Sequence, residues 1–135
     1  MKKLFLLLTI AIAASCTTQV HQSNVLDVVP YPNDVQVGEG VFSAKGAAVV
    51  YDESVDEASA NVIKAFAEKL AFASGVQNAV SVGAADNGFV FTYNAEVPAE
   101  AYTLNVTPEA VRVEASGLRG FNYAIQTIKK LLVQV

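Results

Sequence analysis

The chain has 135 residues, a length that suits one ordinary domain. Of these, 53% are hydrophobic, enough to bury a core without disulfides or structural metal ions. Thirteen acidic side chains against nine basic ones give a net charge of −4, and no cluster of lysine or arginine is present. This balance argues against nucleic acid or anionic lipid as an electrostatic partner, and the single cysteine excludes an internal disulfide.

Residues 1–15 have the layout of a secretory signal peptide: two lysines, an apolar run over residues 4–14 interrupted at Thr9, and then small residues. The run is too short to cross about 30 Å of hydrocarbon, which takes about 20 residues. A buried core helix is the alternative, but it fits poorly with a run that begins at the extreme N-terminus behind two lysines. We therefore predict export and removal of residues 1–15.

Cys16 follows Ala13-Ala14-Ser15 directly, an arrangement that resembles the bacterial lipobox, whose cysteine is diacylated and becomes the first mature residue. One departure is Ala13, because the third residue before the cysteine is usually leucine or a similar bulky aliphatic. The alternative is a cysteine that falls by chance near an ordinary signal-peptidase site. Lipidation at Cys16 would hold the protein at a membrane of the cell envelope. Residues 16–27 would then be a flexible tether.

The folded part is predicted to begin at residue 28, where Pro30 and Pro32 favour extended backbone. Valines on either side of the break at Gly38-Glu39-Gly40 indicate two short strands at Val35, Val37 and Val41. A compact apolar run over residues 47–51 predicts a buried strand.

The first predicted helix runs from about Ser54 to Gly75. Ser54 and Glu57 have the spacing of a capping box, with the serine as the N-cap, and Gly75 is placed to end the helix. Lys64 and Glu68 lie outside its apolar stripe as i,i+4 partners. The stripe consists of Val62, Phe66, Leu70 and Ala73, with Ile63 beside it.

Beyond residue 78 the apolar period changes to two. Residues 80–82 and 89–93 are candidate strands, the second preceded by a turn at 86–88. Residues 102–106 and 111–115 alternate cleanly and are joined by a short connector, which predicts a hairpin.

After Gly117 a second helical stripe follows, with Lys129 and Lys130 in the last turn, where the helix dipole favours a cation. Its apolar positions are Phe121, Ile125, Ile128 and Leu132. The fold class expected from this order is α+β, a largely antiparallel sheet with two helices packed on one face.

Two stretches, Glu100–Pro108 and Arg119–Thr127, resemble the corresponding text of bacterial β-N-acetylhexosaminidases of glycoside hydrolase family 20. The second contains Gly-Phe-x-Tyr-Ala-x-Gln-Thr, the most specific part. Val29–Pro32 is also similar to the family's usual opening. The resemblance spans about residues 28–133 and implies the family's non-catalytic N-terminal α+β domain. One departure is Ala110, at a hairpin position where relatives often have glycine.

In family 20 a catalytic (β/α)8 barrel follows this domain, and such a barrel needs about 250 residues. We therefore expect the barrel to be absent from residues 28–135 and the chain alone to be inactive. The resemblance implies a partner, the barrel of the same parent protein, which hydrolyses terminal N-acetylhexosamines of glycans. It implies no catalytic, substrate-binding or metal-ligating residue here and no cofactor. The partners we expect are thus the barrel and, through Cys16, a membrane, but no nucleic acid.

Neighbouring Asp and Glu residues perform the chemistry in family 20, and this chain contains Asp52-Glu53 and Asp56-Glu57. Both pairs flank the start of the first helix, so we interpret them as capping and dipole residues. The single histidine, His21, lies in the predicted tether without ligands at metal spacing. Arg119 begins the second helix, and it is either an ordinary surface arginine or a contact to a partner.

Two other hypotheses stay open at this point. One is a free-standing lipoprotein that binds glycans or another envelope protein, and the other is catalysis by this chain alone. Because similar domains precede barrels in other glycosidase families, the enzyme class is less constrained than the fold. An accessory role also predicts an apolar surface that the barrel would cover.

Overall fold

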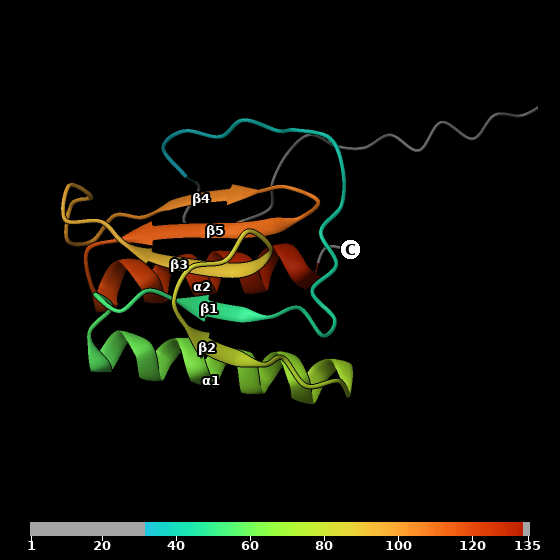
Figure 1. The fold of residues 1–135 in the computed structure, drawn as a ribbon. Helices are drawn as coiled ribbons and strands as arrows, with labels where there is room; N and C mark the ends of the chain where they lie inside the picture. The colour runs from blue at the N-terminus through green and yellow to red at the C-terminus, as the bar shows by residue number, and fades with distance from the viewer. Residues whose placement is uncertain (1–31, 134–135) are drawn as a thin grey trace, which may run out of the picture.

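The computed structural model describes residues 32–133 (Figure 1). In chain order the elements are β1 Val49–Tyr51, α1 Glu57–Ser74, β2 Val80–Val82, β3 Gly88–Tyr93, β4 Thr103–Val106, β5 Ala110–Ala115 and α2 Leu118–Val133. The predicted signal peptide (1–15), Cys16, the tether (16–27) and the proline-rich opening up to Tyr31 lie outside the described residues.

The five strands form one mixed sheet in the order β2-β1-β3-β5-β4. Three neighbouring pairs are parallel, and only β4 and β5 are antiparallel. The expectation of a largely antiparallel sheet is therefore wrong. The hairpin of β4 and β5 exists, but β4 occupies the outer edge, so β5 becomes the parallel neighbour of β3. The connection from β3 passes beyond β5 before β4 begins (Figure 1).

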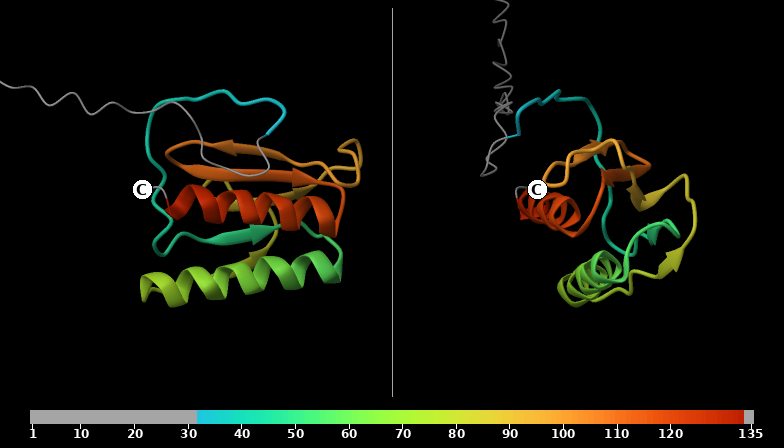
Figure 2. Two further views of the ribbon diagram at one scale, coloured as in Figure 1. Left: turned by 180° about the vertical axis from the view of Figure 1, so that it is seen from behind. Right: turned by 90° about the vertical axis from the view of Figure 1, so that its left-hand side faces the viewer.

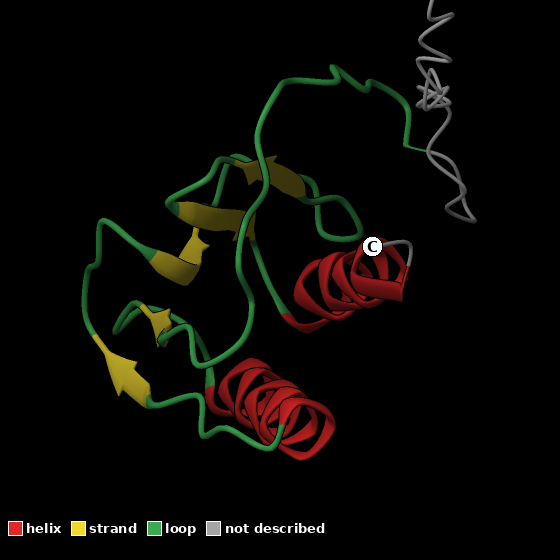
Figure 3. Ribbon diagram, turned by 90° about the vertical axis from the view of Figure 1, so that its right-hand side faces the viewer, coloured by secondary structure: helices red, strands yellow, loops and turns green. Residues whose placement is uncertain are grey.

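Both helices lie on the same face of this sheet, side by side (Figures 2 and 3). Four phenylalanines fill the space between the layers: Phe66 from α1, Phe89 and Phe91 from β3, and Phe121 from α2. Their rings meet edge to face, with centroids 5.2 Å apart for Phe66–Phe89 and 6.2 Å apart for Phe91–Phe121. This geometry adds to the stabilisation by apolar burial.

The opposite face of the sheet carries no helix but is not bare. The connection from β2 to β3 passes over it (Figures 1 and 2). Arg112, the register partner of the buried Val90, donates hydrogen bonds to the carbonyl oxygens of Ala85 (3.3 Å) and Asp86 (2.9 Å) in that connection. One arginine on β5 thereby helps to hold a connection that belongs to the other half of the sheet.

The start of α1 differs from the prediction. Asp56, not Ser54, is the N-cap, since its carboxylate accepts hydrogen bonds from the Ser59 backbone N–H (2.8 Å) and the Ser59 hydroxyl (2.9 Å). Ser54 lies before the helix, with its N–H bonded to Asp52. The predicted end is confirmed: Gly75 adopts the left-handed conformation with φ 70° and donates to the Ala71 carbonyl.

The two short strands predicted around residues 35–41 are wrong, because residues 32–48 form no strand. This segment runs around the β4 side of the sheet and then descends to β1 (Figure 1). Side-chain contacts hold this segment in place of strand hydrogen bonds. The Phe42 ring packs on the Phe89 ring, with the ring centroids 5.0 Å apart. The buried amide of Asn78 also donates to the carbonyl oxygens of Ala44 and Ala47.

Candidate functional site: a cleft between the helices

The first Asp-Glu pair is occupied by the backbone. The Asp52 carboxylate accepts hydrogen bonds from the N–H groups of Ser54 (2.8 Å) and Tyr93 (2.6 Å), which ties the end of β1 to the end of β3. Glu53 beside it is exposed. Asp52 thus fixes two strand ends.

The second pair belongs to the helix cap. Hydrogen bonds from Ser59 to Asp56 hold the pKa of that carboxyl below its usual value. A lowered pKa suits a permanently charged cap and is the opposite of what a general acid needs at neutral pH. The interpretation of Asp56-Glu57 as capping residues is confirmed for Asp56, whereas Asp52 has a different structural role.

The remaining sequence candidates divide between the surface and the undescribed part. Arg119 forms a salt bridge with Glu100, and both side chains are exposed. His21 and Cys16 lie outside the described residues. Within residues 32–133 no group of three or more His, Cys, Asp or Glu side chains could hold a metal ion. The same residues contain no helix long and apolar enough to cross a membrane.

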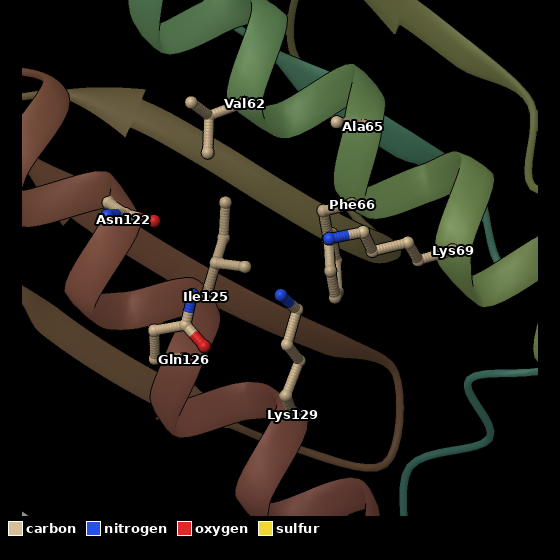
Figure 4. A pocket seen from close by; sticks show the side chains of 8 residues that line it. All are labelled: Val62, Ala65, Phe66, Lys69, Asn122, Ile125, Gln126 and Lys129. Carbon is tan, nitrogen blue, oxygen red and sulfur yellow. The ribbon is translucent and has the colours of Figure 1, made fainter.

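One concave feature stands out, a cleft of about 220 Å³ between α1 and α2 (Figure 4). Its apolar base comes from the buried Phe66 and Ile125 together with the half-buried Val62. Lys69 and Lys129 reach over it from opposite helices (Figure 4). The other lining residues are Ala65, Asn122 and Gln126.

The sequence explains why the helices leave this gap. Phe66 and Ile125 turn toward the sheet, where both are almost fully buried, so neither fills the outer part of the helix–helix seam. Ala65 presents only a methyl group there. Val62 was predicted as part of the core stripe, but it is only partly buried and lines the cleft.

The electrostatics of the cleft set it apart from the rest of this acidic chain. Burial, and secondly the positive charge of Lys69, lower the pKa of the Lys129 ammonium. The lining includes no acidic side chain. Two ammonium groups therefore stand over an apolar base without a carboxylate from the lining. Sequence reasoning missed this site because only the packing of the two helices brings residues 69 and 129 together.

The lining contains no carboxylate or histidine that could serve as a base beside the two lysines. The cleft is also smaller than the roughly 300–1,000 Å³ of typical small-molecule pockets.

The sequence profile described as "Glycosyl hydrolase family 20, domain 2" matches residues 25–135. The chain belongs to this family. No curated protein sequence matches it significantly. Among solved structures it is similar to the family 20 exo-β-N-acetylglucosaminidase of Vibrio harveyi in complex with N-acetylglucosamine. There the TM-score is 0.62 at 24% identity over 77% of this chain.

It is also similar to the β-N-acetylhexosaminidase of Bacteroides fragilis NCTC 9343, with a TM-score of 0.58 and 26% identity over 76% of this chain. The chain spans only 16% of the Vibrio enzyme and 20% of the Bacteroides enzyme. The likeness therefore concerns one domain of much longer proteins. It supports the family 20 resemblance seen in residues 100–108 and 119–127.

The most specific family 20 segment has two kinds of residue. Gly120, Phe121 and Ala124 point inward, and the Thr127 hydroxyl lies 2.5 Å from the Tyr102 hydroxyl, so these positions serve the fold. A second set, Asn122, Tyr123 and Gln126, is exposed, and two of its members line the cleft. These outward positions have no evident role in packing the described residues.

Proposed function

We propose that this chain is the non-catalytic domain 2 of an exported β-N-acetylhexosaminidase, which hydrolyses terminal N-acetylhexosamines through a (β/α)8 barrel outside these residues. The family assignment and the likeness to one domain of two enzymes of this class support the proposal. Asp52 and Asp56, both engaged by backbone N–H groups, also support it, because neither is free to act as the family's catalytic carboxylate.

The role of the domain is to dock on the barrel through the outer surface of α1 and α2. The observation that carries this step is the cleft, together with an apolar surface beside it. Phe72 is 93% exposed, and it lies on the same side of α1 as Ala65, seven residues earlier. Tyr123 on α2 is 47% exposed. Large apolar groups left in water next to a concavity are typical of a surface that another domain covers.

The decisive experiment begins with the coding sequence that follows residue 135 in the genome. If it continues into a barrel, we expect the joined protein to release p-nitrophenol from p-nitrophenyl N-acetylglucosaminide, and residues 16–135 alone to release none. An unrelated downstream gene, with no barrel in any frame, would count against the proposal. Activity of the isolated chain would refute its non-catalytic role.

The docking surface has its own test in the joined protein. Phe72→Ser should weaken the association of the two domains. In a thermal melt of the joined protein, domain 2 should then unfold at a lower temperature, as a transition separate from that of the barrel. Asn105→Ser is the control, because Asn105 is exposed on β4 and is the register partner of Arg112, on the face of the sheet without helices; it should leave the melt unchanged. Equal melts for both variants would place the interface elsewhere.

A free-standing glycan-binding lipoprotein receives less support from the site. Sugar sites commonly stack a ring on an exposed aromatic face, but the aromatic residue of this cleft, Phe66, is only 2% exposed. Calorimetry with N-acetylglucosamine oligomers should therefore show no heat above dilution. Saturable heat would restore the glycan-binding hypothesis.

For export, we infer that residues 1–15 are a lipoprotein signal peptide and that Cys16 carries the lipid, which places the domain in the cell envelope. The sequence pattern alone supports this part of the proposal. Mass spectrometry of the mature N-terminus should find a diacylated cysteine. Cys16→Ser should release the protein from membranes, and a membrane-bound, unlipidated Cys16→Ser protein would contradict the inference.

A further inference from the structure

We propose that Lys69 and Lys129 form a carboxylate-receiving pair that takes one aspartate or glutamate side chain of the docked catalytic domain, while an apolar neighbour of that acid fills the cleft. This inference rests on the proposed function, since it names the chemistry that the docking partner presents. The two lysines come from different helices, so they also fix where the partner sits along the helix–helix seam.

The shape of the cleft favours an apolar side chain as its filling. Its base is apolar, with Phe66 and Ile125 buried beneath and Val62 at the wall. The two lysine ammoniums reach over the middle of this base, and Gln126 lies at its side (Figure 4). Apolar groups buried beneath polar ones are common in protein–protein contacts.

The charges favour an acid on that rim. Lys69 and Lys129 repel each other, and among the described residues the salt bridge present joins Arg119 to Glu100, so neither cleft lysine has such a partner there. On α1, the Lys64 ammonium is turned away from the cleft and lies 6.0 Å from the centroid of the Tyr51 ring. An incoming carboxylate would thus offset the repulsion between the two ammonium groups and form a favourable interaction with each of them.

Burial strengthens this preference for one occupant. Lys129 is partly buried, and the lowered pKa of its ammonium reflects both lost hydration and the charge of Lys69. A carboxylate that excludes water from the cleft meets two cations that are already partly desolvated, so less hydration is lost on binding. A cationic or neutral partner side chain gains nothing comparable.

The test uses hexanoate and hexylammonium, two probes with the same alkyl chain and opposite charge, added to the mature chain at low salt. NMR of the Val62 and Ile125 methyl groups should show saturable shifts with hexanoate and a Kd at least about fivefold higher for hexylammonium. The preference should disappear in about 1 M salt, where the Debye length falls to about 3 Å.

A matched pair of variants assigns the effect. In Lys69→Gln/Lys129→Gln the Kd for hexanoate should rise about fivefold, whereas Lys130→Gln, an exposed lysine outside the cleft, should leave it unchanged. The same spectra report whether each variant is folded. If the double variant is unfolded, Lys69→Gln alone, at an exposed position, should show about half of the effect in free energy.

Three results would overturn the proposal: no saturable shift with hexanoate, equal binding of both probes, or hexanoate binding that the double variant leaves intact. These outcomes are independent of the parent enzyme. A downstream sequence without a barrel would remove the proposed function while charge selection by the cleft persisted. If the parent carries a barrel but domain 2 does not select between the two probes, only the proposal about the lysine pair is refuted.

Discussion

Replacing Gly120 by alanine should destabilise the domain, although alanine is the better helix former. A Cβ at Gly120 would lie 2.3 Å from the carbonyl oxygen of Ala101 and 2.8 Å from the Cβ of Ala115. Neither neighbour yields easily, because the first is backbone and the second is a fully buried β5 residue. The first turn of α2 would have to move by roughly 1 Å to restore ordinary contact.

The expected magnitude combines two opposing effects. Helix propensity favours alanine over glycine by about 1 kcal/mol. Overpacking of a well-packed core costs about 1–3 kcal/mol, and here the shift also disturbs Phe121, the next residue, which contacts the phenylalanine cluster. The two effects differ by about 0–2 kcal/mol, and because the disturbance of Phe121 adds to the cost we expect a net loss of about 1–2 kcal/mol. Such a loss lowers the Tm of a domain of this size by roughly 4–16 °C.

Urea and thermal unfolding of the mature chain, followed by far-UV circular dichroism, measure this loss. Gly38→Ala is the matched control, since nothing lies within 4 Å of a Cβ at that position and its backbone is not left-handed. The control should change the free energy of unfolding by less than about 0.5 kcal/mol. A Gly120→Ala protein as stable as the wild type, or more stable, would refute the close approach of α2 to Ala101.

Variants at three further positions test other contacts. Asp56→Ala should cost about 1 kcal/mol by removing the cap on Ser59. Because the pKa of Asp56 is lowered in the folded state, the carboxylate stabilises the fold fully above pH 3.8, its ordinary pKa. This stabilisation fades as the pH falls through the folded pKa. Asp56→Asn should keep the cap without this pH dependence. Tyr102→Phe removes the hydroxyl contact with Thr127 and should cost about 1 kcal/mol in urea melts. Lys129→Met should raise the free energy of unfolding at neutral pH, because the lowered pKa of Lys129 in the folded state means that its charge is unfavourable there. The gain should shrink as the pH approaches 10.5. A pH-independent difference would show that charge is not the cause.

The helices were predictable from sequence because their signals are local. A 3.6-residue apolar stripe depends only on neighbouring residues, and both α1 and α2 follow one; Gly75, which ends α1, is an equally local signal. The N-cap was mistaken because two acceptors compete near the same turn. Ser54 has the capping-box spacing to Glu57, but the Asp52 carboxylate accepts a hydrogen bond from the Ser54 N–H, and Asp56 caps the helix two residues later.

The sheet was harder to predict because alternation shows which residues share a face but not which strands are neighbours. The alternating 103–106 and 110–115 segments do form a hairpin, as expected. That hairpin sits at the sheet edge with β5 inward, an arrangement determined by Phe89, Phe91 and Val113 meeting the helices together. Contacts of this kind join residues far apart in the chain, which the pattern of a single strand does not contain.

The cleft shows the same limit for function. Lys129 was predicted as a cation of the last helical turn, but only Lys130 lies in that turn, and Lys69 was not singled out. Their common role depends on α1 and α2 lying side by side with Phe66 and Ile125 turned toward the sheet. The family 20 resemblance indicated the domain and its expected partner. The positive charge of the proposed contact depends instead on the packing of two helices, which brings together lysines that are 60 residues apart in sequence.

The division of the family 20 segment into inward and outward residues gives the docking proposal its physical basis. Gly120 and Phe121 are explained by close packing within the domain. Gln126 is not, because it is exposed and lines the cleft. A side chain that contributes nothing to its own core is free to serve a second surface, and the apolar base and paired ammoniums beside Gln126 define what that surface must offer. If the proposed docking holds, the domain would contribute to its parent enzyme by fixing the position of the catalytic domain.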